Sequence, residues 1–238
     1  LTWAYLKPHL PRDLATPVLD LGCGTGKWGL KLLHAGFHVT FVDIAGAMVE
    51  RARKKVGDAG LLARAEFLRA DLVDLGEIPK GHFGFAAALG DPIGCATSPP
   101  KALKEIHRRL TADGVLVATF DNKLAALDHY LREGDPQTLR RFLRTGKTHW
   151  LTQDAEERFD IHTFTPREVA KLCAAAGFAV VELRGKTVLD LRKHRTLLTD
   201  PAVRREWQRI EQDVSRDPDA IGRAGHLQVV ARKPGTDA

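Results

Sequence analysis

Val18-Leu19-Asp20-Leu21-Gly22-Cys23-Gly24-Thr25-Gly26 decides the fold, because an apolar strand pattern runs directly into three alternating glycines. A helical pattern follows over residues 27–35. Glycine tolerates positive φ and lets a ligand approach the backbone closely. The N–H groups at the start of the following helix can receive an anionic group. The stretch therefore predicts a strand, a ligand-binding turn and a helix in succession.

The first half of the chain continues this alternation of strands and helices. We expect strands over residues 17–21, 38–42, 65–70, 83–89 and 115–120, and helices over residues 27–35, 46–56 and 100–110. Alternation at this spacing predicts an α/β fold with a mostly parallel sheet and helices on both faces. In such a sheet, ligands bind beyond the carboxyl ends of the strands, where the strand order reverses.

The second half of the chain is less regular. Thr165-Pro166-Arg167-Glu168 predicts a helix start, with a threonine cap, a proline in the first turn and a glutamate three residues after the cap. The expected helices are 124–131, 136–143, 166–176 and 201–214, and the expected strands are 178–183 and 226–231. We interpret residues 122–164 and 187–224 as two helical insertions that cap the strand ends of a single domain spanning residues 1–238.

Composition limits the class of protein. The chain has 238 residues, 44% hydrophobic and 28% charged, which fits an ordinary globular protein. No apolar run approaches the ~18 residues of a membrane span, and no leader of the secretory type is visible, so we expect no membrane span and a cytoplasmic location. The three cysteines lie far apart, which makes a disulfide framework unexpected there. The chain begins at Leu1, so residues could precede it.

The positive charge does not gather in one place. The formal net charge is +6, but the two halves of the chain share the excess equally and there is no polybasic tail. A mixed-charge solvated surface explains this distribution better than a nucleic-acid-binding face, so nucleic acid is not the expected partner.

Asp20 separates two interpretations of the glycine turn. Residues 24–29 also match the GxGxxG pattern of dinucleotide-binding proteins, but one such match is weak. Asp20 stands two residues before the first glycine, where a carboxylate would repel a pyrophosphate. S-adenosylmethionine carries an ammonium and a sulfonium, and a nearby carboxylate favours these charges. The turn therefore predicts S-adenosylmethionine as the cofactor.

Two further acidic residues follow strands. Asp43 ends the second expected strand, 17 residues after Gly26, and could accept hydrogen bonds from both ribose hydroxyls. Taken alone, an Asp that ends a strand is more often a helix cap, but together with the glycine turn the ribose role is the better interpretation. Asp71 follows the third strand and could bond the adenine amino group, or lie exposed in a turn.

These motifs together resemble the class I S-adenosylmethionine-dependent methyltransferases, and within them the small-molecule group that includes the ubiquinone and menaquinone methyltransferases. The resemblance rests on VLDLGCGTG, FVDIAGAMVERARKK, the triplet ADL and the strand FAAALGD, and it covers residues 17–120. It implies an open, doubly wound seven-stranded sheet with an antiparallel last strand. It also implies a lid segment over residues 1–16.

The resemblance assigns binding roles to residues of this chain. It implies Asp20, Gly22, Gly24 and Gly26 around the methionine part, with Cys23 packed in the same turn; Asp43 on the ribose; Ile44 and Met48 against adenine; Asp71 and Leu72 at the adenine edge; Leu89 under the cofactor; and Trp3 and Tyr5 as a cover.

The acceptor side is less determined. Asp91 in Gly90-Asp91-Pro92-Ile93 follows the fourth strand and is the first candidate to orient or deprotonate an acceptor, with a plain turn as the alternative. Ile93 departs from the Pro-Pro-aromatic continuation of many nucleic-acid and glutamine N-methyltransferases. His149 and His162 are further catalytic candidates in the first insertion. No HxxxH or CxxC spacing occurs, so we expect no metal.

The expected activity is methyl transfer from S-adenosylmethionine to an oxygen or nitrogen atom of a small molecule. Three alternatives remain: an RNA methyltransferase, favoured by the pI of 9.3 and three arginine pairs; a non-catalytic S-adenosylmethionine-binding module; and an NAD-dependent oxidoreductase, which rests only on the nested GxGxxG. The sequence leaves the acceptor and the oligomeric state open.

Overall fold

The computed structural model describes residues 1–149 and 159–235, except the side chains of residues 192 and 193. Seven strands form one sheet in the order β3-β2-β1-β4-β5-β9-β8. The strands are β1 (Val18–Leu21), β2 (Val39–Asp43), β3 (Ala65–Arg69), β4 (Phe83–Ala88), β5 (Leu110–Asp121), β8 (Ala179–Lys186) and β9 (His226–Arg232).

Strand direction confirms the predicted fold class. Each pairing among β1 to β5 is parallel. β9 runs antiparallel to both of its neighbours, β5 and β8. Two strands are longer than the sequence pattern predicts: β5 begins at Leu110, which pairs with Phe83, and β8 extends to Lys186, which pairs with His226.

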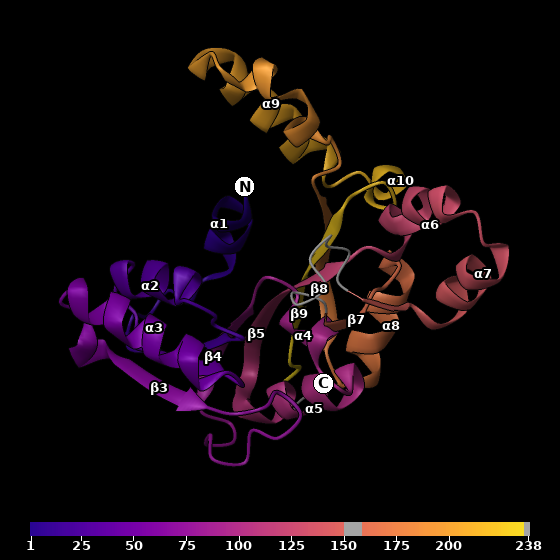
Figure 1. Ribbon diagram of the computed structural model, residues 1–238. Coiled ribbons are helices and arrows are strands. Elements are labelled where there is room, and N and C mark those ends of the chain that lie inside the picture. Colours follow the sequence, from indigo (N-terminus) through magenta and orange to yellow (C-terminus); the bar gives the residue numbers. More distant parts are fainter. Residues whose placement is uncertain (150–158, 236–238) are drawn as a thin grey trace.

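Helices cover both faces of the sheet (Figure 1), and each face has its own apolar core. The helices α2 (Lys27–His34) and α3 (Gly46–Asp58) pack on one face, where Phe85 and Ala87 of β4 point. The helices α5 (Pro99–Arg109) and α8 (Pro166–Ala175) pack on the other face, where Ala86 and Ala88 point. This division follows from the two-residue side-chain alternation along a strand that is buried on both sides.

The strand order reverses between β1 and β4. The chain moves outward from β1 to β2 and β3, then returns to pair β4 with the other side of β1. In open parallel sheets this reversal leaves a crevice at the carboxyl ends of the two central strands. The glycine turn follows β1 at that edge, and Asp91 lies just beyond β4, so the fold brings the two most informative motifs together.

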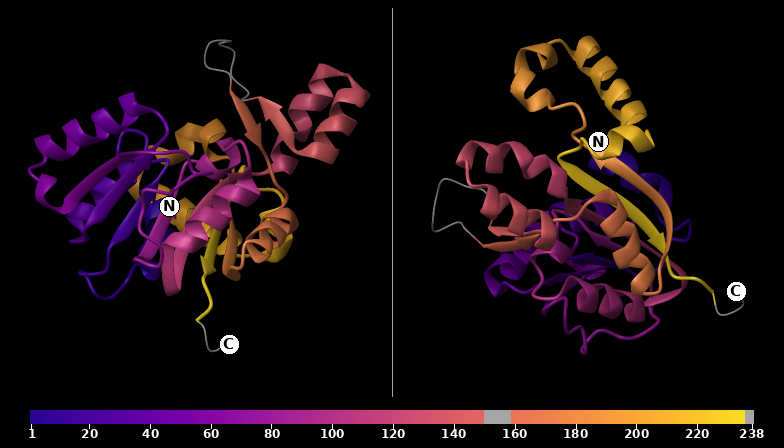
Figure 2. Two further views of the ribbon diagram at one scale, coloured as in Figure 1. Left: turned by 90° about the horizontal axis from the view of Figure 1, so that it is seen from below. Right: turned by 90° about the vertical axis from the view of Figure 1, so that its right-hand side faces the viewer.

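Two excursions leave the sheet in the second half of the chain (Figure 2). The first holds η3 (Lys123–Ala126), α6 (Leu127–Glu133), α7 (Pro136–Thr145) and a hairpin of β6 (Lys147–His149) with β7 (Asp160–His162). The second holds η5 (Leu191–Leu198), α9 (Pro201–Val214) and α10 (Pro218–Ile221). Their role as a cap remains a prediction.

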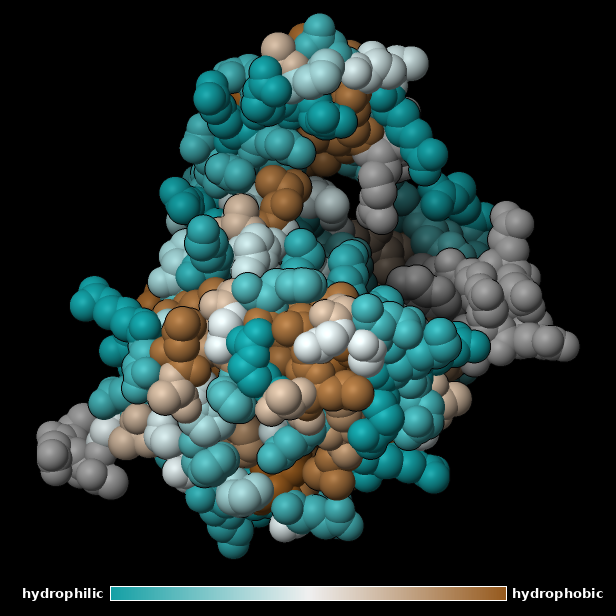
Figure 3. All heavy atoms as spheres, turned by 90° about the vertical axis from the view of Figure 1, so that its left-hand side faces the viewer, coloured by the Kyte–Doolittle hydropathy of each residue, from teal (hydrophilic) through white to brown (hydrophobic). Residues whose placement is uncertain are grey.

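The helix α9 stands away from the sheet, and the surface is hollowed between it and the body of the molecule (Figure 3). At the N-terminus, the short helices α1 (Thr2–Leu6) and η1 (Lys7–His9) precede β1. None of the helices within residues 1–149 and 159–235 combines the length and the apolar character that crossing a membrane requires.

Candidate active site

All three glycines of the turn after β1 adopt left-handed backbone conformations, with φ of 62° at Gly22, 51° at Gly24 and 77° at Gly26. A Cβ at Gly22 would lie 2.3 Å from Cβ of Pro92, and one at Gly26 would lie 3.0 Å from Cβ of Ala52. Close packing against Pro92 and Ala52 therefore leaves no room for a side chain at Gly22 and Gly26. A Cβ at Gly24 would meet no atom within 4 Å, so the turn is open at its middle glycine.

Asp20 lies beneath this turn and is only 1% exposed. Its Oδ2 accepts a hydrogen bond from the backbone N–H of Gly29 at 2.7 Å. Burial, together with the nearby charge of Asp43, raises the pKa of the Asp20 carboxyl to about 7, although the Gly29 hydrogen bond opposes the shift. The side chain thus ties the end of β1 to α2 and carries a proton easily lost or gained near neutrality.

Asp43 ends β2 and connects two loops. Its Oδ2 accepts the N–H of Gly24 at 2.8 Å, and its Oδ1 accepts the N–H of Ala45 at 2.9 Å. The second bond lies in the loop before α3, whose N-cap residue is Ala45 and which has no side-chain cap, so Asp43 does not cap this helix. Each carboxylate oxygen has a further lone pair, and the side chain is partly exposed, so these bonds leave room for ribose hydroxyls.

The residues predicted around adenine line the same edge. Ile44 directly follows Asp43 and is 60% exposed, an unusual exposure for a large apolar side chain beside a buried strand. Met48 is partly buried on α3, while Leu72 is buried in the core. Asp71 accepts the N–H of Val73 at 3.0 Å, as a turn residue would.

The two predicted lid residues, Trp3 and Tyr5, have different surroundings in the structure. Trp3 packs against the apolar cluster that contains Cys23 and Leu89, and Nζ of Lys31 lies 5.6 Å from its ring centroid. Tyr5 is buried, and its ring lies 4.4 Å from the guanidinium carbon of Arg184 on β8. Trp3 therefore packs on the α2 side of the sheet, whereas the ring of Tyr5 contacts Arg184 on β8.

Asp91 occupies a strained position at the carboxyl end of β4. Its φ is 64°, which a non-glycine residue adopts only at an energetic cost. Thr119 of β5 holds this backbone, because its Oγ1 accepts the N–H of Gly90 at 2.9 Å and that of Asp91 at 3.1 Å. The Asp91 side chain is buried, and its Oδ1 has no hydrogen-bond partner.

Two residues that the sequence patterns did not single out complete this part of the site. Nδ1 of His226, the first residue of β9, lies 3.0 Å from Oδ2 of Asp91 and 2.9 Å from Oδ1 of Asp121, the last residue of β5. The hydrogen bonds to Asp121 and to Asp91 raise the pKa of His226 to about 9, against the effect of burial. We call Asp91, Asp121 and His226 the Asp–His–Asp cluster.

Two other ionisable groups lie near this cluster. Burial lowers the pKa of Lys186 on β8, and the charges of Asp91 and Asp121 act in the opposite direction. Burial raises the pKa of the Cys95 thiol to about 11, with smaller contributions from the same two carboxylates. Cys95 belongs to α4 (Pro92–Cys95), the short helix that Asp91 begins.

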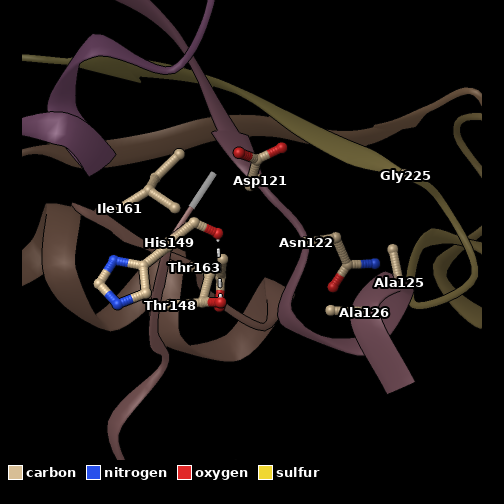
Figure 4. A pocket seen from close by; sticks show the side chains of 9 residues that line it. All are labelled: Asp121, Asn122, Ala125, Ala126, Thr148, His149, Ile161, Thr163 and Gly225. Carbon is tan, nitrogen blue, oxygen red and sulfur yellow. Dashed lines mark hydrogen bonds between the residues drawn. The ribbon is translucent and has the colours of Figure 1, made fainter. Parts of the chain in front are cut away.

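A pocket opens beside the cluster, between the end of β5 and the β6–β7 hairpin (Figure 4). Its volume is about 170 Å³, and it is lined by Asp121, Asn122, Ala125, Ala126, Thr148, His149, Ile161, Thr163 and Gly225. Asn122 and the ring of His149 lie on opposite sides of it (Figure 4). Asp121 belongs both to the pocket and to the cluster.

The two predicted catalytic histidines lie on the hairpin. His149 is exposed, lines the pocket, and forms an ion pair of 2.6 Å between its Nδ1 and Oδ1 of Asp160. Nδ1 of His162 lies 3.2 Å from the carbonyl oxygen of Gly94 on α4. The structure thus brings His149 to the pocket and His162 to the helix that Asp91 begins.

The sequence contains only a weak indication that Asp121, Asn122 and His226 belong to the site. Asp121 ends β5 and Asn122 follows it, just as Asp43 ends β2 and Asp91 lies just beyond β4. His226 opens a strand that runs antiparallel, so its first residue lies at the same edge as the last residues of β4 and β5. That geometry requires the strand order, which the sequence does not state.

Comparison with known proteins relates the first half of the chain to methyltransferases. Residues 18–114 match the family model described as a methyltransferase domain. The chain is 32% identical to the uncharacterized methyltransferase YodH of Bacillus subtilis over 42% of this chain and 41% of that one. It is 28% identical to a demethylmenaquinone methyltransferase of Clavibacter sepedonicus over 75% of this chain and 71% of that one.

Two longer but weaker matches span nearly the whole chain. A tRNA 5-carboxymethoxyuridine methyltransferase of Escherichia coli is 24% identical over 91% of this chain and 80% of its own. The crystal structure of a S-adenosylmethionine-dependent methyltransferase from Methanosarcina mazei superposes with a TM-score of 0.67, at 21% identity and 97% coverage of both chains. At these identities the second match shows the fold alone.

Proposed function

The chain belongs to the class I S-adenosylmethionine-dependent methyltransferases, and from this premise we propose that it transfers the methyl group of this cofactor to an oxygen or nitrogen atom of a small-molecule acceptor. The observation that carries the proposal is the open middle of the glycine turn. Gly24 faces free space at the strand-order reversal, and its N–H is held by Asp43. A ligand can therefore approach the backbone there more closely than any side chain would allow.

The residues around the turn fit S-adenosylmethionine better than a dinucleotide. Asp20 and Asp43 lie close enough for the charge of Asp43 to raise the pKa of Asp20. Two carboxylates at one turn oppose the binding of a pyrophosphate and favour a cationic ligand. In the proposed complex, Asp20 and the turn hold the methionine part, Asp43 holds the ribose, and Ile44 and Met48 cover adenine.

The remaining predicted cofactor contacts fall into two groups. Asp71 and Leu72 would lie at the adenine edge, and Leu89 and Cys23 would pack under the ligand. Trp3 would cover it from α1, and Tyr5 would support that helix from its buried position. When bound, S-adenosylmethionine supplies a methyl group on a positively charged sulfur that leaves readily.

The chain itself then has to orient the acceptor, exclude water and receive a proton. Asp91 is the residue we propose for orienting the acceptor or taking its proton, because its Oδ1 is free of hydrogen bonds and lies at the carboxyl end of β4. His149 and His162 are proposed to contact the acceptor from the β6–β7 hairpin. A proton released by the acceptor oxygen or nitrogen would pass to the Asp91 carboxylate.

The pocket favours a small acceptor. A cavity of roughly 150 Å³ accommodates a benzene molecule, and the pocket of about 170 Å³ beside Asp121 matches that size. Ala125, Ala126 and Ile161 give it apolar walls, while Asp121 and Asn122 offer polar contacts. A one-ring acceptor with a polar substituent fits these walls.

Methyl transfer is tested directly with S-adenosylmethionine labelled in its methyl group and a panel of phenols, quinols, carboxylic acids and amines. We expect labelled product from at least one class, and loss of most of the rate in Asp91→Asn. Cofactor binding with no transfer to any member would instead support the non-catalytic binding module.

An RNA substrate is the second candidate, because a tRNA methyltransferase is among the relatives that span most of the chain. Its test is labelled methyl transfer to unfractionated tRNA and rRNA from a strain that lacks the gene. Incorporation into RNA at a rate above that for every small acceptor would replace the first proposal with this one.

A further inference from the structure

We propose that the Asp–His–Asp cluster is a binding site for one divalent metal ion, which would hold oxygen atoms of the acceptor at the carboxyl edge of the sheet. The expectation of no metal from the sequence rested on short-range ligand spacings. The cluster instead draws its ligands from the loop after β4, the end of β5 and the start of β9, which are 30 to 135 residues apart in sequence, as the Asp91–His226 contact illustrates. Ion binding by itself does not depend on the proposed function, whereas the role toward the acceptor rests on it.

The ligand atoms of the cluster are spaced closely enough for one metal ion. Oδ2 of Asp91 and Oδ1 of Asp121 lie 3.0 and 2.9 Å from the same nitrogen, Nδ1 of His226. In an octahedral site with metal–ligand distances of about 2.1 Å, neighbouring ligand atoms lie about 3.0 Å apart. Ligand atoms from all three residues lie within 4.8 Å of one another. The nitrogen and each carboxylate oxygen are therefore already spaced as neighbouring ligands of one small ion, and the remaining distance is at most 4.8 Å.

Protons alone do not satisfy the hydrogen-bonding groups of the cluster. Nδ1 of a histidine carries at most one hydrogen, yet two carboxylates converge on it. Asp91 is 6% exposed, and its Oδ1 has no hydrogen-bond partner, which is costly for a buried carboxylate. A divalent cation that displaces the proton of Nδ1 would compensate both carboxylates at once.

The chemistry of the three ligands indicates which ions would bind. Two carboxylate oxygens and one imidazole nitrogen suit first-row divalent ions such as Mn²⁺ and Zn²⁺. Three protein ligands leave positions open for water or substrate atoms. Asp121 lies both in the cluster and on the wall of the acceptor pocket, so the open positions can receive oxygen atoms of an acceptor bound there.

One neighbouring group opposes the ion, and it supplies a test. Lys186 pairs with His226 across β8 and β9 and interacts with the charges of both carboxylates. Its ammonium group disfavours a second cation nearby. Lys186→Gln should therefore tighten metal binding, whereas removal of a ligand should weaken it. If the cluster only stabilised the fold through ion pairs, the variants would show no such opposite effects on metal affinity.

The experiment uses the full chain after treatment with EDTA, titrated with Mn²⁺ while the electron paramagnetic resonance signal of free Mn²⁺ is followed. We expect one ion bound per chain. Asp121→Asn and His226→Gln should each weaken binding at least about tenfold, and Lys186→Gln should strengthen it. His129→Gln is the matched control, because it removes another histidine–carboxylate pair, the 3.1 Å contact with Glu133.

A cooperative urea unfolding transition reports whether each variant is folded, and calorimetry separately measures its binding of S-adenosylhomocysteine. No saturable binding of Mn²⁺ or of Zn²⁺ to the wild-type chain would overturn the inference, as would equal affinities in wild type, Asp121→Asn and His226→Gln. These outcomes leave the proposed function untouched if S-adenosylhomocysteine binds. Conversely, a folded chain that binds Mn²⁺ but not S-adenosylhomocysteine would overturn the proposed function alone.

Discussion

Asp20 shows how one residue links the fold to the ligand. Its carboxyl is buried under the glycine turn, and burial raises its pKa from 3.8 to about 7. A folded-state pKa above the unfolded value means that the native state holds the proton more tightly. The stability associated with the protonated form is therefore fully present below about pH 4 and is lost as the pH rises through about 7.

Asp20→Asn should remove this pH dependence, because the amide keeps a hydrogen-bond acceptor for Gly29 and carries no charge. We expect the variant to gain stability relative to wild type between pH 5 and pH 8.5, by a few kcal/mol at most. Urea unfolding of both proteins at the two pH values measures the difference. An unchanged difference between the two would mean that Asp20 is not buried as described. The same variant should bind S-adenosylhomocysteine more weakly, which separates stability from function.

The elements that could be predicted from sequence are those with a local cause. The strand β1 and its glycine turn follow from an apolar run that ends in alternating glycines. The start of α8 follows from the Thr165–Glu168 capping box, which forms as expected: the Thr165 hydroxyl accepts the Glu168 N–H, and the Glu168 carboxylate accepts the Thr165 N–H. For the cofactor residues, the sequence motifs indicate Asp43 and Gly24, which the structure brings into contact at 2.8 Å.

The elements that escaped prediction depend on distant contacts. The β6–β7 hairpin is short and mostly polar, and it is fixed by pairing between residues such as Thr148 and Ile161. The predicted helix at 124–131 divides into η3 and α6. The Asp–His–Asp cluster exists only because β9 inserts between β5 and β8. No local pattern carries that information.

The helix α5 supplies a prediction at the scale of an element. The Arg109 side chain is 3% exposed, and it donates hydrogen bonds of 2.7 Å to Glu105 on the preceding turn and to the carbonyl oxygen of Ile78. Glu105→Ala leaves the buried guanidinium without its carboxylate, and such a loss costs about 3–5 kcal/mol. Urea unfolding should show this drop. The exposed Lys104→Ala on the same helix should change stability little, and equal effects of both would contradict the account.

At the scale of the whole molecule, the question is how charge is distributed. The net charge of +6 is spread over both halves of the chain, and the pocket is lined by uncharged or acidic residues apart from His149. We expect only weak, non-specific attraction to RNA, because few phosphates can be neutralised at one face. Filter binding of tRNA at 50 and 200 mM salt measures this. Tight binding that persists at the higher salt would favour the RNA methyltransferase.

The whole account depends on the glycine turn as the place where the cofactor binds. Gly24 and Gly60 are matched, because both have left-handed backbones, with φ of 51° and 69°, and open space where a Cβ would be. Only Gly24 lies in the turn. Substitution to valine should therefore strain the backbone similarly at Gly24 and Gly60. Only Gly24→Val would place a side chain in the space proposed for the cofactor.

The most direct test is calorimetric titration of wild type, Gly24→Val and Gly60→Val with S-adenosylhomocysteine. We predict one site in wild type, a similar affinity in Gly60→Val, and no measurable binding in Gly24→Val although its unfolding midpoint matches that of Gly60→Val. Binding that survives in Gly24→Val, or preferential binding of NADH by the wild-type chain, would contradict the central claim.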